Sequence, residues 1–199
     1  TADGRYVIVF NGEVYNFKEK RLELESRGRT FATHSDTEVV LQLYAQFGLA
    51  FVDHLNGMFG LAILDRTTRE LVVVRDRIGI KPLYYFRDAD KIVFASEIKA
   101  ILAHREVRRE IDREGLGAYL RYGFTPPPYT LFKGIRKLRP AHLLRLHSNN
   151  VVEQRYWHLS YKEKLRAGED ELGEQRYSLL DDSVRHQMIA DVPLGAFLS

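Results

Sequence analysis

A strand that runs directly into an Asn-Gly pair is the feature that most constrains what this sequence can fold into. The strand is RYVIVF at 5–10, and Asn11 and Gly12 follow it. Asn-Gly is typical of hairpin turns and helix caps, because both residues readily take positive backbone angles. No second strand follows, however, since residues 18–28 have the composition of a helix that ends at Gly28. Such a turn would place backbone N–H groups and the Asn11 amide at a strand end, where they can receive an anion or an oxyanion.

A second helix is predicted within residues 31–48. Its apolar positions, which share one helical face, are Val39, Val40, Leu43, Tyr44 and Phe47. Ser35 and Glu38 match a capping box ahead of this face. Asp36 lies inside the box, where a carboxylate interacts favourably with the helix dipole.

Short strands and helices account for the remaining sequence. The predicted strands cover residues 57–65, 70–76, 91–96, 141–147 and 151–157, and another begins within 75–86. The predicted helices cover 97–104, 113–123 and roughly 171–190, with a Pro-rich connector at 124–132 and a charged linker at 162–171. The last two strands should form a hairpin over Ser148, Asn149 and Asn150. A length of 199 residues is enough for one or two domains with a real core.

Composition argues against several classes of protein. There is no cysteine, which excludes disulfides and thiolate metal sites, and the seven histidines show no metal-ligand spacing. The net charge is only +3 and no blocks of like charge occur, so we expect no nucleic-acid partner. No apolar run approaches the roughly 18 residues of a membrane span, and no signal-peptide pattern opens the sequence. We therefore expect a cytoplasmic protein that has no metal site in these residues.

Several segments occur in an order along the chain that matches one family. They are FNGEVYN at 10–16, THSDTEVVL at 33–41, GMFGLAILD at 57–65, RDRIGIKPLYY at 75–85, FASEIKAIL at 94–102, YTLFKGIRKLRPAH at 129–142, RYW at 155–157 and ADVPLGAFLS at 190–199. Taken together, they resemble the glutamine-hydrolysing asparagine synthetases over nearly the whole chain. Each segment is a weak signal alone, and their number and order carry the resemblance.

The resemblance implies an α+β fold of the N-terminal-nucleophile type, an αββα sandwich with two antiparallel sheets between helix layers. It implies a class II glutamine amidotransferase (glutaminase) domain at 1–160 that lacks its N-terminal segment. Residues 161–199 would then be a linker and the first helix of an α/β synthetase domain. In such enzymes the first domain hydrolyses glutamine to ammonia, and the second uses ATP to amidate aspartate through aspartyl-AMP. The implied substrates are L-glutamine, L-aspartate and ATP, the last with Mg²⁺, and a homodimer is left open.

The resemblance also implies roles for individual residues. Asn11, through its side chain, and Gly12, through its backbone N–H, match the family's oxyanion hole. Glu13 matches a residue that helps to hold glutamine, and Asp36 matches the carboxylate that binds the α-ammonium group of glutamine. A carboxylate that faces a cation is a physically sound pairing. The capping role and the substrate role of Asp36 are compatible.

The chain also departs from the family pattern. The family's nucleophile is an N-terminal cysteine, which is absent here. Thr1 is not expected to replace it, because an extended strand would separate Thr1 from Asn11 by roughly 30 Å. Only Leu198 and Ser199 match the ATP-binding loop. We therefore expect an interior fragment that alone binds no cofactor and is inactive in both half-reactions. Ala141 stands where the family usually has glycine, so it should be strained if its φ is positive.

Three other functions are compatible with these residues. The first is an amidotransferase that passes glutamine nitrogen to another acceptor, although the ADVPLGAFLS segment argues against sugar-phosphate and phosphoribosyl acceptors. The second is an enzyme similar to the β-lactam synthetases, whose first domain is idle. The third is a non-catalytic scaffold that keeps the fold. The presence of Asn11, Gly12, Glu13 and Asp36 argues against an idle domain.

Overall fold

The computed structural model describes residues 1–148, 150–162, 164–190 and 192–197. The chain divides into two compact units, Thr1–His158 and Leu159–Ser199. Among the described residues of the second unit is one long helix, α5 (Glu169–Gln187). All of the strands and the other helices described below belong to the first unit.

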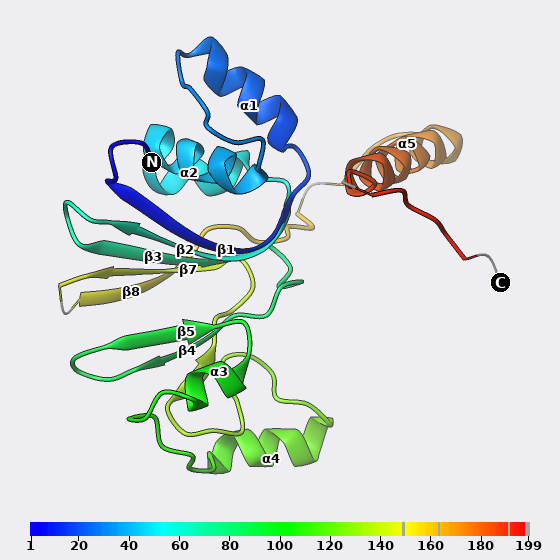
Figure 1. Ribbon diagram of the computed structural model, residues 1–199. Helices are drawn as coiled ribbons and strands as arrows, with labels where there is room; N and C mark the ends of the chain where they lie inside the picture. The colour runs from blue at the N-terminus through cyan, green and yellow to red at the C-terminus, as the bar shows by residue number, and fades with distance from the viewer. Residues whose placement is uncertain (149, 163, 191, 198–199) are drawn as a thin grey trace. The chain divides into compact units, whose positions relative to one another are not determined.

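Two antiparallel sheets are stacked in the first unit (Figure 1). The larger sheet has the order β1 (Tyr6–Val14), β2 (Gly57–Asp65), β3 (Glu70–Arg75), β7 (His142–His147) and β8 (Asn150–Arg155). The smaller sheet has the order β5 (Ile92–Ala95), β4 (Tyr84–Arg87) and β6 (Ile135–Lys137). Every neighbouring pair of strands is antiparallel, which confirms the two antiparallel sheets predicted from the sequence.

Helices cover the outer faces of the two sheets (Figure 1). The helices α1 (Phe17–Ser26) and α2 (Asp36–Phe47) lie over the larger sheet, and the 3₁₀ helix η1 (Gly48–His54) connects α2 to β2. The helices α3 (Ile98–Leu102) and α4 (Arg113–Tyr122) lie beyond the smaller sheet. The layers are therefore helix, sheet, sheet and helix, as the family resemblance implied.

The side chains of β1 alternate between the face of the sheet that packs against α2 and the opposite face. Tyr6, Ile8 and Phe10 pack into the cluster beneath α2, whose fully buried members include Leu43 and Phe51. The intervening residues of β1 point to the opposite face of the sheet, because successive side chains of a strand alternate. The core between the two sheets lies beside β2 and β3 rather than beside β1. Its buried members are Ala62, Val73, Leu83, Leu138 and Leu144.

The Asn11-Gly12 pair does not form a turn, and this corrects the sequence interpretation. Strand β1 continues through both residues to Val14, in register with β2, so Asn11 lies inside the strand rather than at its end. Gly12 is not among the glycines with positive φ. A Cβ atom on Gly12 would lie 2.1 Å from the Met58 carbonyl oxygen. Glycine is needed here for the close approach of β2, and cross-strand pairing overrides the local turn preference.

Other differences are small and have local causes. The sequence assigned no strand to Ile135–Lys137, which forms β6 by pairing with β4. It also did not predict η1. Ala141 has a φ of 58°, which confirms the predicted strain at this position. The hairpin of β7 and β8 has Ser148 at its turn and Asn150 already inside β8, while Asn149 lies outside the described residues.

Candidate active site at the end of β1

Three of the predicted site residues are consecutive in the second half of β1. In the β1–β2 ladder, Asn11 lies opposite Gly60, Gly12 opposite Phe59, and Glu13 opposite Met58. Because side chains alternate, Asn11 and Glu13 project from the face that turns away from α2. The Asn11 side chain is exposed and Glu13 is partly buried. This end of β1 therefore presents an amide and a carboxylate on the same face of the sheet.

The Asn11 amide is held by a serine that the sequence did not single out. Asn11 Nδ2 donates to Ser96 Oγ at 2.8 Å. Ser96 directly follows β5 in the smaller sheet, so this bond joins the two sheets. Ser96 is part of the FASEIKAIL segment, but no local pattern pairs it with a residue 85 positions earlier. Only the fold brings the two side chains together.

Asp36 is tied to the same end of β1. It is the first residue of α2, directly after the N-cap Ser35. Its Oδ2 accepts the Val14 backbone N–H at 3.0 Å, and its Oδ1 accepts the Thr37 hydroxyl at 3.2 Å. The side chain is partly buried. Asp36 thus has a structural contact with the residue that follows Glu13, while part of its hydrogen-bonding capacity stays available to a ligand.

The predicted capping box is only half correct. Ser35 Oγ accepts the Thr37 backbone N–H at 3.0 Å, as an N-cap residue should. The Glu38 carboxylate does not reach back to Ser35, because it accepts the backbone N–H groups of Ala32 at 2.8 Å and Thr33 at 2.7 Å. Burial alone would raise the pKa of Glu38, but the hydrogen bonds from Thr33 and Ala32 lower it. Glu38 therefore fixes the loop that leads to Asp36.

Two further side chains fix the backbone around the site. Asn16 donates to the His54 carbonyl at 2.9 Å and accepts the Asn56 N–H at 3.0 Å, which holds the end of β1 against the segment before β2. The buried Asp76 carboxylate accepts the backbone N–H groups of Phe59, Ile80 and Lys81. Since Phe59 pairs with Gly12, Asp76 supports the strand behind the site. No motif in the sequence predicts this role for Asp76.

The electrostatics of the site are dominated by carboxylates. Glu13 and Asp36 have no ion-pair partner among the residues that the structure describes. Burial raises the pKa of the neighbouring Tyr15 hydroxyl, and the negative charges of Glu13 and Asp76 raise it further. Unpaired carboxylates beside an exposed amide donor suit a ligand that carries both a cation and a carbonyl oxygen.

Thr1 lies at the opposite end of β1. Its ammonium group donates to the Tyr6 carbonyl at 2.9 Å, and its hydroxyl accepts the Tyr6 N–H at 3.1 Å. Residues 1–4 turn back on the strand, so the roughly 30 Å separation expected for an extended chain is wrong. Tyr6 is five residues from Asn11, about 17 Å at the usual rise of a strand. Thr1 is therefore not positioned to act at Asn11.

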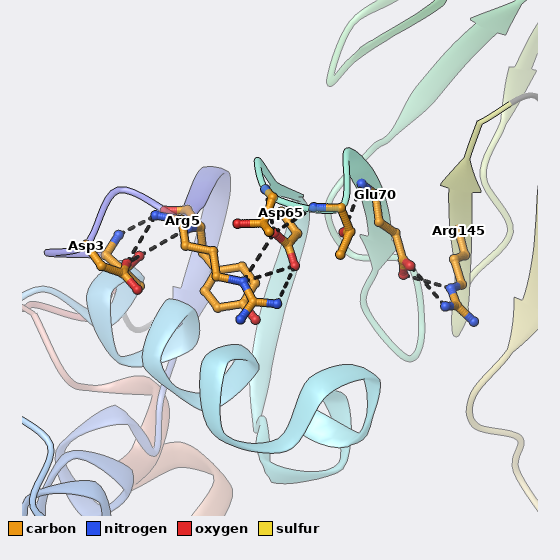
Figure 2. Close-up of polar contacts among 9 residues, drawn as sticks. Asp3, Arg5, Asp65, Glu70 and Arg145 are labelled. Atoms are coloured by element: carbon orange, nitrogen blue, oxygen red, sulfur yellow. Dashed lines mark hydrogen bonds and ion pairs between the residues drawn. The ribbon is translucent and has the colours of Figure 1, made fainter.

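Ion pairs, rather than site residues, occupy the end of the sheet where Thr1 lies (Figure 2). Arg5 donates to both oxygens of the Asp65 carboxylate, the shortest contact being 2.8 Å. The Arg5 hydrogen bonds are the main reason that the pKa of Asp65 falls to about 2. Glu70 and Arg145 form a second bidentate pair across β3 and β7. One end of the larger sheet therefore carries paired charges, and the other carries the candidate site residues.

Three further predictions concern ATP-binding residues, metal sites and membrane-spanning helices. Leu198 and Ser199, the predicted ATP-binding residues, are outside the described residues. In the part of the chain that the structure describes, no group of three or more His, Cys, Asp or Glu side chains could hold a metal ion. Likewise, no described helix is both long enough and apolar enough to cross a membrane.

Comparisons with known proteins identify the family of this chain. The family model of the glutamine amidotransferase domain matches residues 1–157. Asparagine synthetase [glutamine-hydrolyzing] 3 of Bacillus subtilis is 40% identical over 98% of this chain, and asparagine synthetase [glutamine-hydrolyzing] 1 of the same organism is 38% identical over 99%. The chain spans about a third of the length of these relatives, 32% and 31% respectively.

A solved structure supports the fold independently. Glutamine phosphoribosylpyrophosphate amidotransferase of B. subtilis superposes with a TM-score of 0.53, over 76% of this chain and 29% of that one. The two sequences are 24% identical, so this likeness bears on the fold alone. It agrees with an N-terminal-nucleophile arrangement of two stacked antiparallel sheets. Since the family model covers residues 1–157, most of the first unit and of the whole chain, this protein belongs to the glutamine amidotransferase domain family.

Proposed function

We propose that this chain is the glutaminase part of a glutamine-dependent asparagine synthetase. The observation that carries the proposal is that Asn11 and Asp36 lie at the same end of β1. A hydrogen bond to Ser96 holds the Asn11 amide, and the Val14 N–H holds the Asp36 carboxylate. The relatives that cover nearly all of the chain are named as glutamine-hydrolysing asparagine synthetases, which supports the same function.

The proposed reaction is hydrolysis of the glutamine side-chain amide to glutamate and ammonia. Attack on the amide carbon turns the carbonyl oxygen into an oxyanion, and the C–N bond then breaks to release the nitrogen. Donors aimed at the developing oxyanion stabilise the transition state more than the substrate. We assign this role to the Asn11 amide and the Gly12 backbone N–H. Each such donor is typically worth about 3–4 kcal/mol.

The two carboxylates would hold the substrate in place. Glutamine carries an α-ammonium group with three N–H donors, and a carboxylate is its natural partner. We assign Asp36 to the α-ammonium and Glu13 to an adjoining polar contact. The Val14 N–H fixes the Asp36 carboxylate before any ligand binds, which reduces the entropy lost on binding.

The proposal names no nucleophile within these 199 residues. They include no cysteine, and Thr1 is hydrogen-bonded to Tyr6 at the other end of β1. The residues described here would therefore bind, orient and stabilise the reacting amide. The attacking group would come from another part of the whole protein.

The remaining part of the chain is proposed to begin the synthetase domain. We place the glutaminase domain at 1–160 and the start of the synthetase domain at 161–199, close to the division between the two compact units. Helix α5 supports this, since Tyr177, Leu179 and Leu180 are each at least 62% exposed. Large apolar side chains of this kind suit a helix that packs against further protein.

ATP, Mg²⁺ and aspartate are proposed as ligands of the whole protein in the cytoplasm. The described residues do not form a metal cluster, and the two residues assigned to ATP lie outside them. None of the steps proposed for Asn11, Gly12, Glu13 and Asp36 involves ATP.

Nitrogen transfer in the whole protein tests this function. The purified full-length protein would be incubated with glutamine labelled with ¹⁵N at the side-chain amide, together with aspartate, ATP and Mg²⁺. We expect ¹⁵N in the side-chain amide of asparagine, detected by NMR. Label in a different acceptor would reject the asparagine synthetase assignment, and absence of labelled ammonia and labelled product would reject the glutaminase assignment.

A further inference from the structure

The hydrogen bond between Asn11 and Ser96 fixes the direction of the second N–H of the Asn11 amide. An amide nitrogen carries two hydrogens that point in different directions in one plane. One N–H of Asn11 is donated to Ser96 Oγ at 2.8 Å. The second N–H is then directed away from Ser96 by the planarity of the amide. Ser96 thus fixes the direction in which Asn11 can donate to a ligand.

Asn11 has no other side-chain hydrogen bond within the described residues. Its side chain is exposed, and the residues that precede it on this face of β1, Val7 and Val9, are 44% and 63% exposed. Packing alone therefore does not select the orientation of the Asn11 amide. Without Ser96, we expect the amide to sample several rotamers in water.

Ser96 itself is held on a rigid part of the fold. It follows Ala95, which pairs with Tyr84 in the β4–β5 ladder. Two residues later α3 begins at Ile98, and Ile98 packs against the cluster that contains the fully buried Ile101. A hydroxyl placed between a paired strand and a packed helix is a firm anchor, and firm anchors give precise sites.

The bond contributes little to holding the sheets together. Asn11 is exposed and Ser96 is only partly buried, so water competes for both groups. The contact between the sheets rests on a buried apolar cluster that includes Leu83, Leu138 and Leu144. Loss of the Ser96 hydroxyl should therefore change the orientation of Asn11 far more than it changes the stability of the fold.

We infer that Ser96 is a positioning residue for amide hydrolysis, which orients the Asn11 amide toward the oxyanion. This inference rests on the proposed role of Asn11 as an oxyanion donor. Ser96 acts through Asn11 and does not touch the reacting atoms. Its contribution belongs to the chemical step, because the oxyanion develops as the amide carbon is attacked and is absent from the bound substrate. Removing the hydroxyl should lower kcat with glutamine and leave KM for glutamine almost unchanged.

The test is a double-mutant cycle in the full-length protein. Ser96→Ala, Asn11→Ala and the double variant would be compared in glutamine-dependent and ammonia-dependent synthesis, with thermal melts of each. Ser96→Thr keeps a hydroxyl at the position. Ser26→Ala is the matched control, because Ser26 Oγ donates to the Glu23 carbonyl within α1 and has no contact with Asn11.

We expect Ser96→Ala to lower kcat with glutamine about tenfold, less than the loss of the donor itself. Ammonia-dependent synthesis and the melting temperature should stay at wild-type values, and Ser96→Thr should retain more activity than Ser96→Ala. In the Asn11→Ala background, Ser96→Ala should have no further effect.

Three results would overturn the inference. Activity of Ser96→Ala equal to that of Ser26→Ala would show that the bond does not orient the amide. Independent, multiplying effects of the two substitutions would show that Ser96 acts by another route. A parallel loss of both activities and of thermal stability would make Ser96 structural. The Asn11→Ala variant separates failure of this inference from failure of the proposed function. If Asn11→Ala loses glutamine-dependent synthesis and keeps ammonia-dependent synthesis, the proposed function stands whatever Ser96→Ala does. If Asn11→Ala shows no such selective loss, the proposed function itself is rejected.

Discussion

At the scale of single residues, the side chains of the site differ in how firmly burial and hydrogen bonds hold them. Asn11 is exposed and anchored by one bond, whereas Asp36 is partly buried and anchored by two. Asp36 also begins a helix, where its negative charge is favourable without any substrate. A substitution at Asp36 must therefore separate a role in binding from a role in capping. Asparagine keeps an oxygen that can accept the Val14 N–H but loses the charge, so the loss of the helix-dipole interaction would appear in a thermal melt and the loss of binding in KM.

Asp36→Asn should raise KM for glutamine strongly in the full-length protein. Removing the charge that faces a bound ammonium group typically costs about 2–5 kcal/mol. Ammonia-dependent synthesis should be unaffected, because it bypasses the glutamine site. The measurement is steady-state kinetics with glutamine and with ammonium. Asp112→Asn is the matched control, since Asp112 caps α4 through the Gly115 N–H, away from β1. Unchanged glutamine kinetics in Asp36→Asn would leave Asp36 as a structural residue alone.

At the scale of secondary-structure elements, the pairing of β1 with β2 determines where the site residues lie. The ladder runs from Tyr6 opposite Asp65 to Val14 opposite Gly57. The first end carries the Arg5–Asp65 ion pair, and the second carries Asn11, Gly12 and Glu13. Substitutions at the first end should therefore change how stability depends on pH in acid. Substitutions at the second end should change strand packing and catalysis.

Gly12→Ala should weaken the pairing of β1 with β2. The new methyl group would lie 2.1 Å from the Met58 carbonyl oxygen, so a strand must move. Forced overpacking of this kind typically costs about 1–3 kcal/mol. Gly117→Ala is the control, because Gly117 lies inside α4 with no atom within 4 Å of an added Cβ. It should instead raise the melting temperature by about 2–4 °C, as removal of an exposed helical glycine usually does. Equal melting temperatures for Gly12→Ala and wild type would contradict the close approach of β2.

The Arg5–Asp65 pair should stabilise the protein at neutral pH and lose that effect in acid. The folded state lowers the pKa of Asp65 from 3.8 to about 2. The contribution of this carboxylate is therefore fully present above pH 4 and is lost as the pH falls toward 2. The melting temperatures of wild type and Asp65→Asn should differ by a constant amount above pH 4 and converge below it. The control is Asp53→Asn, since Asp53 is exposed and makes no ion pair within the described residues. A difference that persists unchanged at pH 2 would show that Asp65 acts without its charge.

At the scale of the whole molecule, the layers of the fold, which the family resemblance implied, were predicted better than the contacts of the site. Strands β2 and β3 and helix α2 follow from local apolar residues, because each contains a continuous run of buried residues that is visible in its own short stretch of sequence. Strand β6 does not, since three residues become a strand only by pairing with β4 about fifty positions earlier. Asn11 was placed in a turn for the same reason, because its partner strand lies outside any local window.

The site itself depends on contacts between distant segments. The Asn11–Ser96 and Asp36–Val14 hydrogen bonds join residues 85 and 22 positions apart. The roles of Asn11, Gly12, Glu13 and Asp36 came from the family resemblance, and they stay proposals. Ser96 and Asp76 could not be singled out from their local sequences, because their importance lies in which backbone or side chain the fold brings to them.

The most direct test of the account is the response of the full-length protein to Asn11→Ala with two nitrogen sources. The loss of one oxyanion donor should lower kcat with glutamine about a hundred- to a thousand-fold. Synthesis from ammonium should continue at the wild-type rate, because free ammonia enters after the step that needs Asn11. Asn150→Ala, at an exposed asparagine that begins β8, is the control for loss of an amide from the same sheet. A parallel loss of both activities, together with a lower melting temperature, would contradict the account and make Asn11 a structural residue of β1.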